Sequence, residues 1–226
     1  MTNRFRIRAR PLALALLAGA LSVPAWGQMA QGSAQDWEIG PIIRGKNYSV
    51  GMPLRPAQGR GQGWSFDFPR ESDGRGRGGH VHYVTFDPGS LAGKTKISVR
   101  YRVDAAPGVR FVPLQFPDRT AAITLYFQRR GDNWTAKGRY QYYRWFAPPA
   151  TMQTIAPGVH ELTVRLDDPS WGSVMSRTAG MNPREFREAL GQSSRVGLVF
   201  GSVGGRGHGV YATGRARFTL LSFRIS

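Results

Sequence analysis

The chain has 226 residues, no cysteine, and 31 Lys and Arg against 14 Asp and Glu, a formal net charge of +17. The lack of cysteine excludes disulfide bonds, lipid attachment to an N-terminal cysteine, and zinc sites with thiolate ligands. A hydrophobic content of 41% together with 29 Gly and 15 Pro predicts a packed domain with many turns and argues against a disordered chain.

Residues 1–27 have the layout of a secretory signal peptide. Arginines precede an apolar run at 12–23, and Ala25-Trp26-Gly27 supplies small residues at the cleavage point. A run of about a dozen residues is too short to cross a bilayer comfortably. We therefore expect a secreted or periplasmic protein with no membrane span, beginning with a flexible leader at 28–36.

The positive charge is spread along the mature chain. The signal segment holds four arginines and no acidic residue, so the mature protein carries about +13. This charge favours a polyanionic partner, either an acidic polysaccharide or another anionic surface polymer. An arginine excess also arises in GC-rich genomes without any role in binding. Nucleic acid is disfavoured by export and by the absence of a recognition motif.

Alternating apolar and polar residues predict strands over most of the mature chain. In 95–103, Ile97, Val99 and Tyr101 alternate with basic and hydroxyl residues, which indicates a half-buried strand with a basic, solvated face. The apolar phase changes near Leu220, which predicts a β-bulge or two differently buried faces. Further strands are expected at 121–130, 138–146, 158–166, 195–200 and 215–225. We expect 121–130 and 138–146 to form a hairpin and 195–200 to be central in a sheet.

One short helix is predicted near 183–190. Asn182 is a suitable N-cap, Pro183 suits the first turn, and Glu185 is placed to close a capping box. Gly191 would end the helix. About ten to twelve strands with one helix are typical of an all-β, two-sheet antiparallel β-sandwich of the jelly-roll kind. We expect a single domain of this class over 37–226.

An aromatic segment is the first candidate for ligand binding. Sugars stack their flat CH faces on rings, and polar neighbours such as Gln128 and Arg144 can bond their hydroxyl groups. The alternative is that the rings fill the core. Because rings occur in both phases of 139–146, they cannot all face inward on one sheet. The candidate rings are Tyr126, Trp134, Tyr140, Tyr142, Tyr143 and Trp145.

The glycine-rich stretch 200–211 is the second candidate. It combines Arg206 and His208 with a backbone whose amides could face an anion. No helix or Gly-Lys-Ser/Thr sequence follows, so it is not a P-loop. The alternative is a tight turn with a surface histidine.

Metal and cofactor sites receive little support. His80 and His82 share one face of a strand, but no third ligand is defined, so we predict no transition-metal site. Asp167, Asp168 or carbonyl groups near 36–40 could hold a structural calcium ion. No other cofactor is expected.

The strand count, the aromatic stretch 121–146 and the closing strands 196–200 and 218–223 resemble secreted jelly-roll domains of the carbohydrate-binding-module and lectin-like kind. The resemblance covers 37–226 and implies sugar binding on a sheet face or at loop tips. The preferred interpretation is therefore a secreted carbohydrate-binding protein that favours acidic polysaccharide, and an enzyme is kept as an alternative.

Two alternatives remain. A polysaccharide lyase on a similar sandwich would neutralise a uronate carboxylate with Arg144, Arg129 or Gln141, and would use His82 and Tyr143 as base and acid. A structural envelope protein would use its charge to contact anionic surface polymers.

Overall fold

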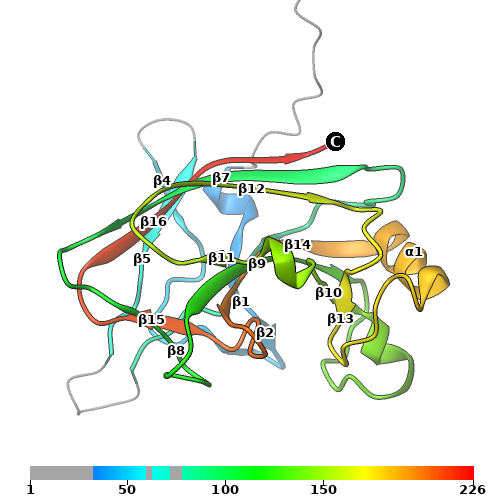
Figure 1. Ribbon diagram of the computed structural model, residues 1–226, viewed down its shortest axis with the longest axis horizontal. Coiled ribbons are helices and arrows are strands. Elements are labelled where there is room, and N and C mark those ends of the chain that lie inside the picture. The colour runs from blue at the N-terminus through cyan, green and yellow to red at the C-terminus, as the bar shows by residue number, and fades with distance from the viewer. Residues whose placement is uncertain (1–32, 60–62, 72–77) are drawn as a thin grey trace, which may run out of the picture.

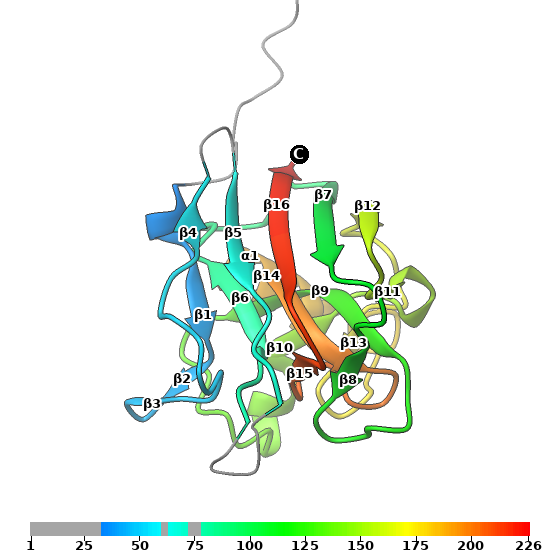
Figure 2. The same cartoon turned by 90° about the vertical axis from the view of Figure 1, so that its left-hand side faces the viewer.

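The computed structural model describes residues 33–59, 63–71 and 78–226. The signal peptide expected at 1–27 and the first part of the leader lie outside the described residues. Within them the chain is mainly β structure with one α-helix, and two principal sheets lie face to face (Figure 1, Figure 2). All ladders between the described strands are antiparallel, which confirms an all-β, sandwich-like fold.

The larger sheet has seven strands in the order β1-β6-β14-β9-β10-β13, and β11 also pairs with β9. The long strand β14 lies inside this sheet between β6 and β9, so the expected central strand is confirmed. The bounds are β1 Glu38–Gly40, β6 Tyr83–Phe86, β9 Ala121–Arg129, β10 Arg144–Phe146, β11 Gln153–Thr154, β13 Gly172–Ser173 and β14 Ser193–Ser202.

The smaller sheet has five strands in the order β12-β7-β16-β5-β4. Its ladder between β16 and β7 shifts register between Leu220 and Ser222, which confirms the predicted bulge. Strand β7 alternates between buried and solvent-facing residues, with arginines on the solvated side, as the sequence indicates. The bounds are β4 Ala57–Gln58, β5 Trp64–Asp67, β7 Lys96–Ala105, β12 Gly158–Arg165 and β16 Ala216–Ile225.

The remaining elements are short and lie at the ends of the sandwich. Two small ladders join β2 to β3 and β8 to β15. No helix in the described part of the chain has the length and apolar character needed to cross a membrane. The bounds are β2 Ile42–Ile43, β3 Lys46–Asn47, β8 Phe111–Pro113, β15 Val210–Ala212, and three short 3-10 helices, η1 Ala34–Asp36, η2 Gly138–Tyr142 and η3 Pro149–Thr151.

The core between the sheets is rich in aromatic rings. The ring centroids of Trp37 and Trp64 lie 4.7 Å apart, and those of Phe66 and Phe218 lie 5.2 Å apart. All four side chains are buried. Because each buried ring of this size contributes about 1.5–3 kcal/mol, this cluster is a main source of the stability of the sandwich.

The side chains of strand β9 lie alternately on the two faces of the larger sheet. Phe127 enters the core between the sheets, while Tyr126 belongs to a separate cluster with Tyr83, Phe146 and Val199. Successive residues of a strand point to opposite faces, so this second cluster lies on the side of the larger sheet turned away from the smaller sheet. We call this side the outer face.

The helix α1, Pro183–Gly191, forms where the sequence predicts it. Its Phe186 packs on Trp145, with ring centroids 4.9 Å apart, and on Phe127 at 5.6 Å. The expected capping box does not form: the Asn182 side chain accepts no hydrogen bond from the helix, and its amide nitrogen donates to the carbonyl of Thr178.

The second strand of the predicted hairpin is much shorter than expected. Residues 138–142 form the 3-10 helix η2, and only Arg144–Phe146 pair with β9. The reason is the preceding loop, where Trp134, Ala136 and Gly138 have positive φ angles of 64°, 55° and 53°. Left-handed residues coil the chain and prevent it from running straight into a ladder.

Folded structure also begins earlier than the boundary at residue 37 that we expected. Residues 34–36, placed by the sequence in a flexible leader, form the 3-10 helix η1. Ala34 is fully buried, and its amide donates to the Gln58 side chain at 3.0 Å. A buried residue and a hydrogen bond to a distant side chain tie this segment to the sandwich.

Candidate functional site

The outer face brings polar side chains of three strands into one row. Arg195 of β14 lies opposite Gln128 of β9, and Gln128 lies opposite Arg144 of β10. Residues directly opposite one another on an antiparallel ladder have neighbouring side chains on the same face. Gln128 and Arg144 are buried, with 8% and 7% exposure, which is unusual for such polar residues on the outside of a sheet.

A loop over residues 131–137, the Trp134 loop, covers this row. The side chain of Asp132 has no exposed area and lies 2.9 Å from Nε of Arg144. Its carboxylate accepts hydrogen bonds from the Gln128 amide and from the backbone N–H of Trp134, each at 3.0 Å. Burial raises the pKa of Asp132, while Arg144 and these hydrogen bonds act in the opposite direction.

Trp134 holds a strained position at the edge of this network. Its φ of 64° lies in the left-handed region, which costs a bulky residue about 1–2 kcal/mol. The hydrogen bond from its amide to Asp132 holds the backbone there. The ring lies 4.9 Å from the Arg144 guanidinium and 5.8 Å from the Tyr83 ring. Strain of this kind is concentrated at ligand sites, where the surrounding structure fixes a side chain in advance.

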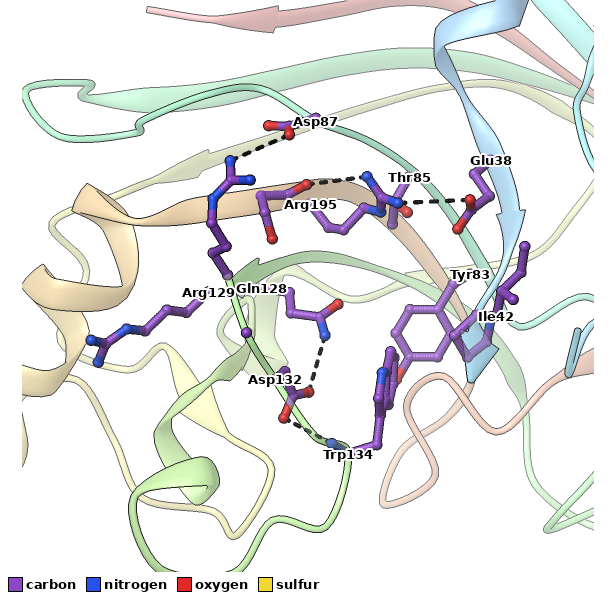
Figure 3. A pocket seen from close by; sticks show the side chains of 14 residues that line it. Glu38, Ile42, Tyr83, Thr85, Asp87, Gln128, Arg129, Asp132, Trp134 and Arg195 are labelled. Atoms are coloured by element: carbon purple, nitrogen blue, oxygen red, sulfur yellow. Dashed lines mark hydrogen bonds and ion pairs between the residues drawn. The ribbon is translucent and has the colours of Figure 1, made fainter. Parts of the chain in front are cut away.

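Beside this ring is a pocket of about 290 Å³, which we call the Trp134 pocket (Figure 3). Its size is near the lower end of the range of about 300–1,000 Å³ for small-molecule sites. Figure 3 shows Trp134 and Tyr83 side by side on one side and Arg195 with Glu38 on another. Polar and aromatic groups from β1, β6, β9, β14 and the neighbouring loops line it, among them Glu38, Thr85, Gln128, Arg130, Trp134 and Arg195.

The charges around the Trp134 pocket are loosely paired. Arg195 lies 3.7 Å from Glu38, and Arg130 lies 3.5 Å from Asp87. These separations are longer than those of charge-assisted hydrogen bonds, about 2.7–2.9 Å. The guanidinium and carboxylate groups at the rim can therefore exchange partners with a polar ligand at low cost. Arg129 points away from the pocket toward α1, where it pairs with Glu188.

Three of the six predicted rings are sealed. Tyr126 and Trp145 have no exposed area, and Tyr143 has 6%. Trp145 faces the core, and its indole N–H donates to the carbonyl of Tyr142 at 2.7 Å. A ring with no exposed face cannot stack on a sugar in this conformation, and none of the three lines the Trp134 pocket.

Two further predicted rings, Tyr140 and Tyr142, are half-buried on η2. The Tyr140 ring lies 4.9 Å from that of Tyr143, and the Tyr142 ring is stacked at 6.4 Å from that of Trp145. Neither lines the Trp134 pocket. Among the predicted rings, only Trp134 combines partial exposure with a place in the pocket.

Arg206 and His208 lie on a turn between β14 and β15, over the outer face. The Arg206 guanidinium sits 4.9 Å from the Phe146 ring and donates to the carbonyl of Ala147 at 3.0 Å. His208 is exposed at the turn. The packed turn partly shields its imidazole from water, which lowers the pKa of His208, and the positive charge of Arg144 lowers that pKa further. The sequence singled out both residues as a second candidate and did not relate them to the aromatic segment.

Two of the residues proposed for a lyase, His82 and Gln141, contact backbone carbonyl groups. Nδ1 of His82 lies 2.8 Å from the carbonyl of Gly207, and its Nε2 is buried without a partner. The Gln141 amide donates to Gly138. In the described ranges, no hydrogen bond or ring contact joins His82 to Tyr143, Arg144 or Gln141. An acid, a base and a carboxylate neutraliser would have to converge on one reacting group, and the lyase alternative stays a prediction.

The candidate metal ligands are engaged elsewhere. The His80 and His82 rings lie 4.8 Å apart, yet the described residues contain no group of three or more metal-ligating side chains. Asp167 pairs with Arg165, and Asp168 accepts a hydrogen bond from the amide of Ser170. The calcium hypothesis stays a prediction.

Several residues of the site were missed by sequence reasoning. In the sequence Asp132 is an ordinary turn residue, and the only sign of a site there is Trp134, two positions later. Tyr83, Glu38 and Arg195 come from strands far apart in the sequence, whose pairing a single sequence does not reveal.

No known family profile matches this chain, and no curated protein matches it.

Proposed function

We propose that this chain is an exported carbohydrate-binding protein and that the Trp134 pocket is its sugar site. The observation that carries the proposal is the Trp134 ring, which is half-buried and fixed in a strained backbone conformation beside a polar pocket. A pocket with an aromatic wall and a few convergent polar groups is the usual form of a small-molecule site.

The chemistry of the lining supports a polyhydroxylated ligand. The indole face can receive the CH face of a sugar ring, while Arg195 donates and Glu38 accepts hydrogen bonds. Thr85 adds a hydroxyl group that does both. Donors and acceptors are mixed around the pocket, as a ligand with many hydroxyl groups requires. The net charge of the whole chain supports acidic polysaccharide, or another anionic surface polymer, as the larger partner.

We further propose that the sandwich follows a jelly-roll path. Successive strands alternate between the two sheets, from β5 to β6, β7 and β9, and later from β12 to β14 and β16. Such alternation is typical of Greek-key and jelly-roll connections.

Trp134→Ala is expected to weaken sugar binding about two- to twelvefold. The lost ring contact corresponds to about 0.5–1.5 kcal/mol, and 1.4 kcal/mol is a factor of ten in affinity. The measurement is titration calorimetry of the mature protein against neutral and uronic-acid oligosaccharides, with circular dichroism to verify folding.

Tyr140→Ala is the matched control, because Tyr140 is a half-buried ring outside the pocket. Its affinity should equal that of the unaltered protein. Loss of binding in Tyr140→Ala with retention in Trp134→Ala would move the site to η2. Absence of binding to every oligosaccharide would refute the proposed function.

A further inference from the structure

Two arginines each lie over a ring of one aromatic cluster on the outer face. Arg144 lies over the ring of Trp134, and Arg206 lies over the ring of Phe146, each at 4.9 Å. Arg144 and Phe146 are two residues apart on β10, so their side chains are neighbours on the same face. The ring centroids of the cluster form a continuous series, in which neighbours are 5.0–5.8 Å apart: Trp134, Tyr83, Tyr126 and Phe146.

Arg144 and Arg206 have fewer hydrogen-bond acceptors than such buried guanidinium groups usually have. A guanidinium has five N–H donors. Arg144 lies 2.9 Å from the Asp132 carboxylate, but its Nε–H is not aligned for a hydrogen bond and is otherwise unpaired. Arg206 donates to the Ala147 carbonyl, and no carboxylate of the described chain forms an ion pair with it. Both groups therefore retain donors for a further acceptor.

The charge balance of the cluster differs from that of other arginines in the protein. Arg217 pairs with Asp67 and Arg165 with Asp167, one carboxylate for each guanidinium. On the outer face, Asp132 is the single carboxylate that forms an ion pair with either of the two arginines in the described chain. One positive charge is left over in a site that is largely removed from water, where an uncompensated charge is costly.

Tyr83 provides a hydroxyl group at the same place. The turn residue Gly207 approaches it so closely that a Cβ there would be 2.6 Å from the Tyr83 oxygen. Burial raises the pKa of Tyr83 to about 12, and the positive charges of Arg144 and Arg206 both oppose that rise. The phenol therefore stays protonated at neutral pH, lies within the field of both arginines, and can donate to an anion.

We propose that Arg144, Arg206 and the Tyr83 hydroxyl form a recognition site for the anionic group of a glycan. The group is the carboxylate of a uronic acid or a sulfate ester, both of which accept hydrogen bonds from guanidinium forks. The inference rests on the proposed function, because it places the charged group of the same ligand beside the Trp134 ring. It goes beyond overall charge by naming the side chains that select the anion.

The test compares three trisaccharides of one sugar: neutral galactose, galacturonate and sulfated galactose. Calorimetry of the mature chain at constant ionic strength should show at least one anionic trisaccharide binding about tenfold tighter than the neutral one, since hydrogen bonds to charged groups contribute about 1.5–3 kcal/mol. The relative affinities of the two anionic forms then tell a carboxylate site from a sulfate site.

Arg206→Gln should reduce the affinity for the anionic trisaccharide to near that for the neutral one and leave neutral binding unchanged. Arg224→Gln is the matched control, since Arg224 is an exposed residue of β16 on the smaller sheet and its loss changes the net charge equally. Arg206 is varied in preference to Arg144, whose loss would leave Asp132 unpaired.

Equal affinity for all three trisaccharides would overturn the anion site and leave the proposed function intact, provided that Trp134→Ala still weakens binding. Equal losses in Arg206→Gln and Arg224→Gln would also overturn it, because only long-range charge would then be acting. If no trisaccharide binds, the proposed function and this inference fail together.

Discussion

Asp132→Ala is expected to lower the free energy of unfolding by about 3–5 kcal/mol, the range observed when one partner of a buried ion pair is removed. The Asp132 side chain has no exposed area, and its loss would leave Arg144 unpaired. It would also remove the acceptor that holds Trp134 in its left-handed conformation. Urea denaturation followed by circular dichroism measures the change.

Two further variants show whether the loss of stability comes from the buried ion pair. Asp167→Ala also removes one carboxylate from an arginine, Arg165, but both side chains are well exposed, so the denaturation midpoint should not move. Asp132→Ala combined with Arg144→Met should recover part of the stability, because no buried charge then lacks a partner. Equal, small effects of Asp132→Ala and Asp167→Ala would show that the buried pair contributes little.

Acidification from pH 7 to pH 4 is expected to destabilise the protein, with about 3 kcal/mol of the loss coming from His82. Burial lowers the pKa of His82 from 6.5 to about 4 in the folded protein. The unfolded chain then takes up a proton near pH 6.5, while the folded chain does so only near pH 4. Stability therefore falls as the pH drops through this window, at 1.36 kcal/mol for each pH unit.

His82→Asn tests this prediction, because an asparagine amide can replace the Nδ1 contact with Gly207 but does not titrate. Comparison at pH 8, where the imidazole is neutral in both states, gives the packing cost of the substitution. At pH 4 the free energy of unfolding of the variant, relative to that of the unaltered protein, should be about 3 kcal/mol higher than at pH 8. The groups near the ring are His80 and His208, whose charges act in the same direction as burial. An identical difference at both pH values would contradict the assignment.

Much of the sandwich could be predicted because its longest strands repeat with a period of two. Strands β7, β12 and β16 lie where alternation placed them, and the change of phase near Leu220 marks a real bulge. The segment 138–142 could not be assigned in this way. It is rich in tyrosine, which favours strands, but the left-handed residues before it override that preference.

The site was only partly predictable for a related reason. Trp134, Gln128, Arg144 and Arg206 were found because they lie near other polar or aromatic residues in the sequence. Tyr83 was missed because it reaches the outer face only through the pairing of β6 with β14. Local patterns give the face on which a residue lies, whereas its neighbours on that face depend on strand register.

The two faces of β9 can be changed independently. Positions 123, 125 and 127 hold the core between the sheets together, while 126 and 128 lie beneath the Trp134 pocket and the proposed anion site. Substitutions at the second set should therefore disturb the outer cluster and the proposed sites and leave the packing between the sheets in place. Inserting a single residue in the middle of β9 would instead exchange the two sets and abolish packing and recognition together.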